Sequence, residues 1–406
     1  MSNATPIDWT VAARWRLLSF AVGVVALVVC AALAVFWPVP FFQAYLAAYL
    51  FYLGIALGSM VLMMAHQLTG GSWGLLIRRI LEAAMKTLPL LAVLFVPIAA
   101  GVAYIYVWAQ PAERAASPKL QYQQFYLQPA YFWIRAAVYF VLWLGIAYLL
   151  GRWSRRQDET GEPRLAWKLL KFSGFGAVLY GISFHFAAVD WAMSVHPAFH
   201  STIWGPMFAA GQLLSALSFA LVVLARLIDR PPLAEVASLQ ARNDLGGLLL
   251  TFTILWAYMV WFQFMLVWIA NMPVDVIWYV PRAALGWQIV IAAVALFNFA
   301  IPFFLLLMRP IKRNSRAMAW IAALMLLMQL LFMFYEILPG LAGDGVAAYL
   351  FGLGASIGLG GLWFADFLWQ LQRRPLLPLH DYNREAALRL RHLDEEEATR
   401  EEIAYG

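Results

Sequence analysis

The stretch Leu53–Ile98, LGIALGSMVLMMAHQLTGGSWGLLIRRILEAAMKTLPLLAVLFVPI, holds the end of one long apolar run and the start of the next, with a short charged segment between them. Crossing the hydrocarbon core of a bilayer, which is ~30 Å thick, takes about 20 apolar residues of helix. The two runs therefore predict two membrane-spanning helices joined at one membrane surface.

The same pattern continues along the chain and predicts an all-α integral membrane protein with ten transmembrane helices. We expect a membrane domain over residues 17–369, preceded by an N-terminal segment, 1–16, and followed by a charged tail, 370–406. The predicted spans are 17–37, 44–66, 89–107, 130–150, 169–189, 202–226, 245–270, 284–308, 317–337 and 346–369.

Basic residues predict the orientation. Of the 28 Lys and Arg residues, only Arg114, Lys119 and Arg282 fall in loops on one side, and Arg135 falls inside a span. The remaining ones lie on the opposite side, and an excess of Lys and Arg in short loops marks the cytoplasmic side. We therefore expect a multi-pass protein of a bacterial inner membrane with both termini in the cytoplasm.

Composition agrees with a membrane protein and excludes several other classes. Hydrophobic residues make up 64% of the chain and charged residues 12%, too few polar groups to cover a soluble protein of this length. The basic loops would meet anionic lipid, so nucleic acid is not an expected partner. The single cysteine, Cys30, cannot hold an iron–sulfur cluster. His66 and His185 are expected on opposite sides of the membrane, so they cannot hold one haem between them. We expect no tightly bound metal.

Two segments outside the predicted spans have their own patterns. Residues 73–87 place Arg78, Glu82 and Lys86 on one helical face, which predicts an amphipathic helix at the inner interface, capped by Ser72. The tail is charged throughout and predicts a solvated helix, with docking of a cytoplasmic partner as the alternative. Pairs of glycines four residues apart, Gly54 with Gly58 and Gly354 with Gly358, predict close helix–helix contacts.

Four ionisable residues in three spans share one depth near the outer surface: Arg135, His185, Asp190 and Glu336. A charge inside a membrane is costly and needs a partner or water. A quinol headgroup needs a hydrogen-bond donor and a proton acceptor, so Arg135, His185 and Asp190 are candidates for a quinone site. The alternative is that each side chain reaches the outer surface separately.

A second set of polar residues is spread through the depth of the membrane. Glu336 and Gln329 share a face of the ninth span, while His66 and Asp366 mark the inner ends of the second and tenth spans. Glu336, Gln329, His66 and Asp366 are therefore candidates for a proton path, because carboxylates and imidazoles exchange protons whereas amides orient water. The alternative is hydrogen bonding across helices for packing. Further amides in the spans are Gln212, Gln263, Gln288 and Asn298.

Three passages together resemble one family: the stretch 53–98 quoted above, DWAMSVHPAFHSTIWG at 190–205, and NDLGGLLLTFTILWAYMVWFQFMLVWIANMPVDVIWY at 243–279. They are similar to the second NrfD/PsrC-like membrane subunit of alternative complex III, the ActF type. The resemblance covers roughly residues 44–310. It implies two four-helix bundles, at about 44–189 and 202–337, with the first and last helices outside them.

The resemblance also implies a function and partners. It implies a membrane subunit of a respiratory quinol:electron acceptor oxidoreductase that supports quinol oxidation and takes part in proton translocation. The expected partners are a sister NrfD-like membrane subunit and iron–sulfur and multihaem cytochrome c subunits, which would carry the haem and iron–sulfur centres. Quinone or quinol is the one small cofactor implied for the membrane part.

One departure from the family pattern bears on quinol chemistry. The sister subunit has a Gly-His-Ala-Gly pattern in an early span, whereas this chain has Gly54-Ile-Ala-Leu-Gly58 in the corresponding span. Structural support or proton handling is therefore the stronger expectation for this chain. Two alternatives stay open: a free-standing secondary transporter, since ten helices with midplane amides also suit one, and a purely structural membrane scaffold for redox subunits.

Overall fold

A computed structural model describes residues 9–283, 286–339, 345–378, 380–381 and 383–405. Within these residues the chain is helical and has no strand, and ten helices are long and apolar enough to cross a membrane. The prediction of a ten-span membrane protein is thus confirmed. The expected N-terminal segment falls partly on residues 1–8, which lie outside the described residues, as do residues 340–344 of the last outer loop.

Most of the spans are single long helices. Their bounds are α1 (Trp9–Ala34), α2 (Pro38–Thr69), α9 (Pro129–Thr160), α10 (Pro163–Trp191), α11 (Trp204–Leu227), α12 (Leu239–Ala270), α17 (Ser315–Ile337) and α18 (Gly345–Gln372). The third span, predicted at 89–107, instead runs from Ser72 to Ala100 and includes the segment predicted to lie at the interface; it is broken into α3 (Ser72–Met85), α4 (Leu88–Leu94) and α5 (Val96–Ala100). The eighth consists of α14 (Trp287–Val294), the π-helical segment η5 (Ala295–Ala300) and α15 (Ile301–Leu307).

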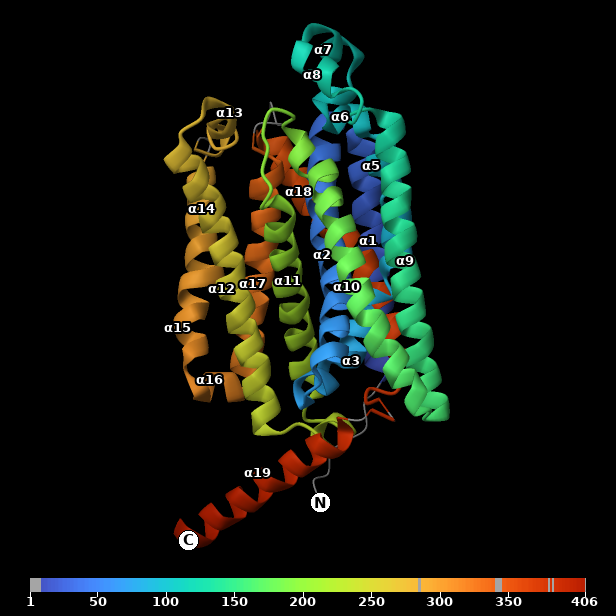
Figure 1. The fold of residues 1–406 in the computed structure, drawn as a ribbon, viewed down its shortest axis with the longest axis vertical. Coiled ribbons are helices and arrows are strands. Elements are labelled where there is room, and N and C mark those ends of the chain that lie inside the picture. The colour runs from blue at the N-terminus through green and yellow to red at the C-terminus, as the bar shows by residue number, and fades with distance from the viewer. Residues whose placement is uncertain (1–8, 284–285, 340–344, 379, 382, 406) are drawn as a thin grey trace.

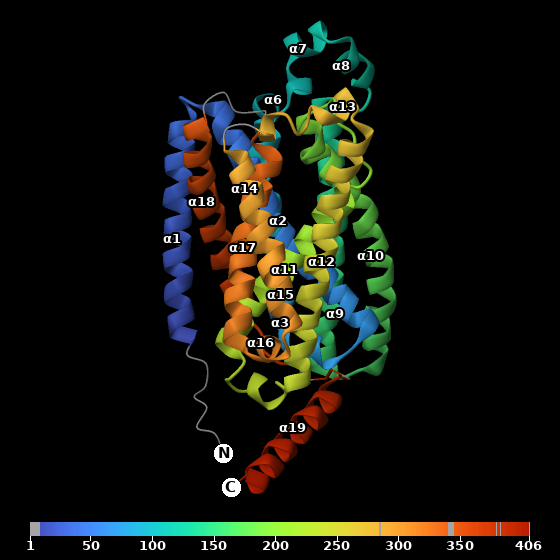
Figure 2. The ribbon, with the colours of Figure 1, turned by 90° about the vertical axis from the view of Figure 1, so that its left-hand side faces the viewer.

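Short helices fill the loops between the spans. The loop before α9 projects from one end of the molecule and contains α7 and α8 (Figure 1). A final helix, α19, extends from the opposite end, where α1 begins and α18 ends (Figure 2). The short elements are α6 (Val102–Ile105), η1 (Val107–Ala109), α7 (Pro111–Ala116), α8 (Pro118–Gln123), η2 (Met193–Val195), η3 (Leu233–Glu235), α13 (Pro273–Val276), η4 (Pro281–Ala283) and α16 (Arg309–Arg313), with α19 at Arg384–Tyr405.

Helices α2 and α11 form the centre of the molecule. They pack against each other, and α2 also contacts α3, α10, α17 and α18, whereas α11 contacts α12 and α17. Helix α1 packs on α18 at one side of the bundle (Figure 2). Most of α2 is buried, whereas α1 exposes most of its length, as expected for a peripheral helix whose apolar side chains face lipid.

The glycine pairs mark close contacts, as the sequence predicts. A Cβ atom at Gly58 would lie 2.2 Å from the Gln212 carbonyl oxygen of α11. A Cβ at Gly354 would lie 2.4 Å from Cys30 Sγ, and one at Gly358 would lie 2.6 Å from the Leu27 side chain, both on α1. These contacts explain how α2 meets α11, and α18 meets α1, at short range.

Helix α3 differs from its prediction. The residues 73–87 do form a helix, but its charged side chains are buried: Arg78, Arg79 and Glu82 are each at most 3% exposed. The N-cap position is Gly71, and no side chain caps the helix. The prediction of a helix is confirmed, but the predicted position of its polar face at the membrane interface is wrong. That face lies against protein, because α9 and the tail cover it.

The charged tail also differs from its prediction. The segment after α18 folds back on the bundle, burying Leu376, Leu377 and Asp381, and only then does α19 begin. Helix α19 extends away from the bundle (Figure 1), in agreement with a solvated helix. The tail is therefore two parts: a tail strap, whose described residues 373–378, 380–381 and 383 are partly buried, and an extended helix.

Candidate functional site

Arg135 and Asp190 form an ion pair between α9 and α10. The Arg135 Nε atom donates to Asp190 Oδ2 at 2.7 Å, and the Tyr139 hydroxyl donates to the same oxygen at 2.7 Å. The guanidinium also lies over the Tyr126 ring, 4.0 Å from its centroid. Asp190 is almost fully buried, so its charge is compensated by protein groups rather than by water.

His185 does not join this pair. It lies five residues before Asp190 on α10, which is about 140° around the helix, so the two side chains point to different neighbours. The His185 ring lies against α11, where a Cβ at Gly205 would come within 2.5 Å of its Nδ1 atom. Of the three quinone-site candidates, the structure thus brings together Arg135 and Asp190 only.

Glu336 lies beside Arg282, at the end of α17. Arg282 is 2% exposed and binds three backbone carbonyls: its Nε donates to Tyr335 at 3.1 Å, its Nη1 to Trp278 at 2.5 Å, and its Nη2 to the carbonyl of Glu336 itself. The Arg282 guanidinium stacks on the Trp278 ring at 3.6 Å. Burial lowers the pKa of Arg282 to about 10, and Glu336 opposes this shift, so the guanidinium stays charged at neutral pH.

His196 completes the cluster around Arg282. Its Nε2 atom donates to the Pro339 carbonyl at 3.3 Å, and its ring meets Trp278 edge to face. Burial, and after it the positive charge of Arg282, lower the pKa of His196 to about 4. His196 is therefore neutral near pH 7, and Arg282 is the permanent cation nearest to Glu336.

The Glu336 side chain borders a cavity of about 560 Å³ between α12, α14 and α17. The wall formed by α12 includes Tyr258 and Trp261, both mostly exposed on the surface of the bundle. Gln263, Tyr279 and Tyr335 also bring polar groups to the cavity wall. Glu336 is 5% exposed, and its Oε2 atom has no hydrogen-bond partner among the described residues.

The amide side chains of Gln329 and Asn298, in the same half of the molecule, are also buried and unpartnered within the described part of the chain. Gln329, one of the proton-path candidates, is 1% exposed, and both atoms of its amide lack a partner. Asn298, in the π-helical segment η5, is fully buried with neither amide atom bonded. Most buried polar groups in proteins are paired, so each unpaired one calls for a specific reason.

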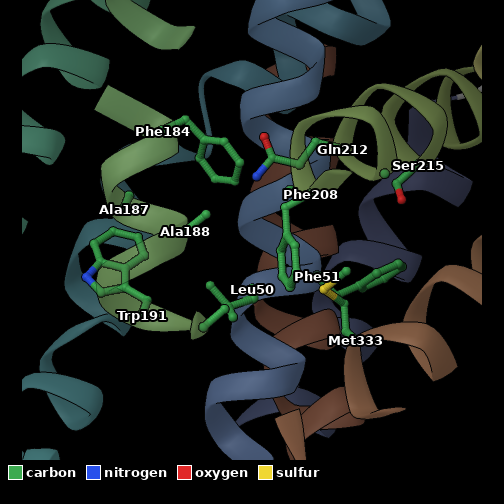
Figure 3. Close-up of a pocket in the computed structure, with 13 residues that line it drawn as sticks. Leu50, Phe51, Phe184, Ala187, Ala188, Trp191, Phe208, Gln212, Ser215 and Met333 are labelled. Carbon is green, nitrogen blue, oxygen red and sulfur yellow. The ribbon is translucent and has the colours of Figure 1, made fainter. Parts of the chain in front are cut away.

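The centre of the molecule, between α2, α10, α11 and α17, holds only a small cavity. Its volume is about 20 Å³, room for about one water molecule. Figure 3 shows its lining, with Phe184 and Phe208 beside Gln212 and with Trp191 further along the wall. The Gln212 amide oxygen accepts a hydrogen bond from Tyr180 at 2.6 Å, which is a packing role.

The remaining proton-path candidates have other neighbours. His66 contacts the Gly71 carbonyl through Nε2 at 3.1 Å, and its ring meets Trp73 edge to face. Asp366 accepts from Gln370 on its own helix at 3.2 Å. Neither hydrogen bond leads to Gln329 or Glu336. Gln288, which the sequence places with the midplane amides, is exposed at the start of α14.

A buried ion network at the charged end of the bundle was missed by sequence reasoning. Its centre is Glu82, which binds Arg79 at 2.7 Å, Arg374 at 3.1 Å and Arg78 at 3.3 Å. Arg78 also pairs with Asp381 of the tail, and Arg79 pairs with Asp158 of α9 at 2.5 Å. The network thus joins α3, α9 and the tail.

The Asp381 carboxyl is stabilised as an anion in this network. Burial alone would raise its pKa, but the Arg78 charge and the hydrogen bonds from Asn383 outweigh it, and the pKa is lowered. Nothing in the sequence pairs Arg78 with a residue some 300 positions away. For Arg282, the sequence does contain a local indication of stacking: the arginine closely follows two aromatic residues, Trp278 and Tyr279, and arginine often lies over the face of such rings.

Within the residues that the structure describes, no three His, Cys, Asp or Glu side chains gather closely enough to hold a metal ion. No model of a known protein family matches the sequence, and no curated protein matches it. The clusters at Glu336, Asp190 and Glu82 are thus the candidates that the geometry itself provides.

Proposed function

We propose that this chain is a membrane subunit of a respiratory quinol:electron acceptor oxidoreductase of the alternative complex III type, and that it handles protons through Glu336. The proposal rests on the three sequence passages that resemble this family and on one structural observation. That observation is a buried carboxyl group with an unpartnered oxygen at the wall of a membrane-depth cavity.

The helix contacts support the two-bundle arrangement that this family implies. Helices α2 to α5, α9 and α10 contact one another, and α11, α12, α14 to α15 and α17 form a second set. In the proposal these are the two four-helix bundles, joined where α2 meets α11, with α1 and α18 outside them. Haem and iron–sulfur centres would lie in partner subunits bound to this membrane part.

The second bundle has the chemistry that proton transfer requires. A carboxyl group can hold and release a proton, whereas amides such as Gln329 and Asn298 can orient water between such groups. Both amides are buried and unpartnered in the described part of the chain, so they can bind water at little cost in lost hydrogen bonds. Glu336 is the proposed proton carrier, and Gln329 and Asn298 are the proposed water-orienting groups.

Arg282 gives Glu336 a defined electrostatic setting. The guanidinium is fixed by three carbonyls and by the Trp278 ring, so it cannot turn away when the carboxyl gains or loses a proton. A fixed positive charge favours the ionised carboxyl while burial favours the neutral one. This balance suits a group that must exist in both forms.

For quinol contact, the proposal keeps Arg135 and Asp190 and sets His185 apart. Asp190 is the proposed acceptor group at the outer ends of α9 and α10, and Arg135 is its ion-pair partner. His185 faces α11 and would act only independently of this pair.

The transporter alternative has less support. Transporters of this size bind substrate near the midplane between two repeats. At that place the cavity is about 20 Å³ and Gln212 is bonded to Tyr180, whereas the larger cavity lies at the side, beside α12. The scaffold alternative predicts that Glu336 can be replaced without functional loss.

The test of the assembly is copurification. The tagged full-length chain should purify in mild detergent with iron–sulfur and multihaem cytochrome c subunits and a sister membrane subunit. Purification of the chain alone, with substrate-dependent uptake after reconstitution, would contradict the proposal.

The test of the proton role is Glu336→Gln in the assembled complex. The substitution keeps the side-chain volume and removes the titratable group. We therefore expect normal assembly, with either the turnover or the proton-to-electron ratio in proteoliposomes reduced at least about tenfold or to zero. A positioned proton-transfer group contributes at least that much to a rate. Glu113→Gln, in the exposed loop helix α7, is the matched control and should leave both unchanged. Wild-type turnover and stoichiometry in Glu336→Gln would decide for the scaffold alternative.

A further inference from the structure

A groove of about 800 Å³ opens on the surface at the charged end of the bundle. It lies between the inner half of α9, the junction of α3 and α4, and the end of α18 with the start of the tail strap. We call it the basic groove. It lies outside the cavity and clusters used in the proposed function.

The floor of the basic groove is the ion network already described, in which the positive charges of the arginines are balanced by the negative charges of the carboxylates. Glu82 and Asp158 are bound by Arg79, and Glu82 is also bound by Arg374. These carboxylates are therefore engaged by buried arginines below the groove.

The lining of the groove adds cations beyond this balance. Four further basic side chains line it, and Glu159 is the one further carboxylate among the described lining residues, so the lining has a surplus of three positive charges. Arg152 and Arg155 are exposed, and Lys86 is half-buried against Gly151 of α9. The four basic residues are Lys86, Arg152, Arg155 and Arg373.

The other half of the groove is apolar. Leu144, Ala147 and Tyr148 of α9 and Pro89 of α4 line it toward the middle of the membrane. Tyr148 is 61% exposed, on a helix face that meets lipid. The groove thus has cations at headgroup depth and an apolar wall at acyl-chain depth, on one continuous surface.

We propose that the basic groove binds one anionic glycerophospholipid from the leaflet at the charged end of the bundle. Its phosphate would lie among Lys86, Arg152 and Arg155, and an acyl chain would follow the wall of Leu144 and Tyr148. Basic pockets between membrane helices favour anionic headgroups, and a free phosphate ion would leave the apolar half unused. The bound lipid would join α9 to the tail strap, since both line the groove.

The test is lipid binding by the full-length protein, together with the subunits that copurify. The protein is stripped of lipid in detergent and titrated with phosphatidylglycerol or phosphatidylcholine, and binding is followed by native mass spectrometry and by the Tm. We expect phosphatidylglycerol to bind and to raise the Tm, and phosphatidylcholine to do neither at the same concentration. Equal binding of both lipids would overturn the proposal.

Two exposed arginines allow a variant that spares the buried network. In Arg152→Gln/Arg155→Gln we expect phosphatidylglycerol affinity to fall roughly 25-fold, since one cation near an anionic headgroup contributes about a factor of five. The control is Arg226→Gln/Arg230→Gln, which removes two exposed arginines elsewhere and should keep wild-type affinity. Wild-type affinity in the Arg152/Arg155 variant would overturn the proposal, as would a Tm increase with inorganic phosphate equal to that with the lipid.

Discussion

The buried carboxyl groups of this protein differ in the groups that compensate their charge. Asp190, Glu82 and Asp381 each face an arginine from another element, whereas Glu336 faces a guanidinium that is already held by backbone carbonyls. The first three are therefore held in ion pairs between elements of the fold. Glu336 is the one of the four that lines a large cavity, and its Oε2 atom, like Asp190 Oδ1, has no hydrogen-bond partner among the described residues.

The Arg135–Asp190 pair should show strong coupling in a double-mutant cycle. Arg135→Met leaves the buried Asp190 carboxylate with the Tyr139 hydroxyl only, which should cost about 3–5 kcal/mol of unfolding free energy. The double variant Arg135→Met/Asp190→Leu should be less destabilised than Arg135→Met alone. The free energies come from denaturant titrations in bicelles or mixed micelles, and additive effects of the two substitutions would contradict the pair.

His196 should make stability depend on pH. Its pKa is about 4 in the folded protein and 6.5 as the ordinary value, so the unfolded state binds more protons between these values. Stability is therefore complete above pH 6.5 and decreases as the pH falls toward 4, by about 1–2 kcal/mol after allowing for its partial exposure. His196→Gln, which keeps a donor for the Pro339 carbonyl, should flatten the Tm between pH 7 and 5; an unchanged slope would assign that pH dependence to other groups.

Helices in this protein meet at short range where a side chain is missing. The α2–α11 contact depends on Gly58, and the α1–α18 contact on Gly354 and Gly358. At the charged end, by contrast, α3 and α9 are joined by ion pairs instead of by close backbones. Close packing thus holds α2 against α11 and α1 against α18, whereas compensated charge joins α3, α9 and the tail.

Gly58→Val should separate α2 from α11. The new Cβ would lie 2.2 Å from the Gln212 carbonyl oxygen, which is backbone and cannot turn aside. We expect a loss of about 1–3 kcal/mol or more of unfolding free energy and a lower yield of monodisperse protein in size-exclusion chromatography. Gly145→Ala in α9 is the control, because no atom lies within 4 Å of its added Cβ, and it should be neutral or slightly stabilising.

Charged residues are concentrated at one end of the molecule, and the loop helices α7 and α8 project from the other end (Figure 1). The bundle begins and ends on the charged side, from which α19 extends (Figure 2). The basic-loop rule predicts that this side is cytoplasmic.

Orientation can be tested with single cysteines in a Cys30→Ala background. Tyr122→Cys, at a residue 89% exposed between α7 and α9, should react with a membrane-impermeant maleimide in intact spheroplasts. Glu162→Cys, between α9 and α10, should react only after the membrane is permeabilised. The reverse pattern would invert the topology.

The sequence by itself determined the number of membrane spans, because about 20 apolar residues per helix is a local property that can be read along the chain. It also determined the glycine contacts of α2 and α18, and it located Arg135, Asp190 and Glu336 correctly at one end of their spans. The functional assignment comes from the resemblance of three passages and remains a proposal.

Only the tertiary structure decided which charges meet. His185 faces α11, Arg282 binds backbone carbonyls at the end of α17, and Arg78 pairs with Asp381. These contacts depend on how helices far apart in sequence rotate and pack. An amphipathic pattern such as that of α3 specifies two faces but not what covers the polar one. Charge compensation in a membrane protein is a pairwise, long-range property. It escapes the sequence because the pattern around each charged residue does not identify the residue, on another helix or in the tail, that pairs with it.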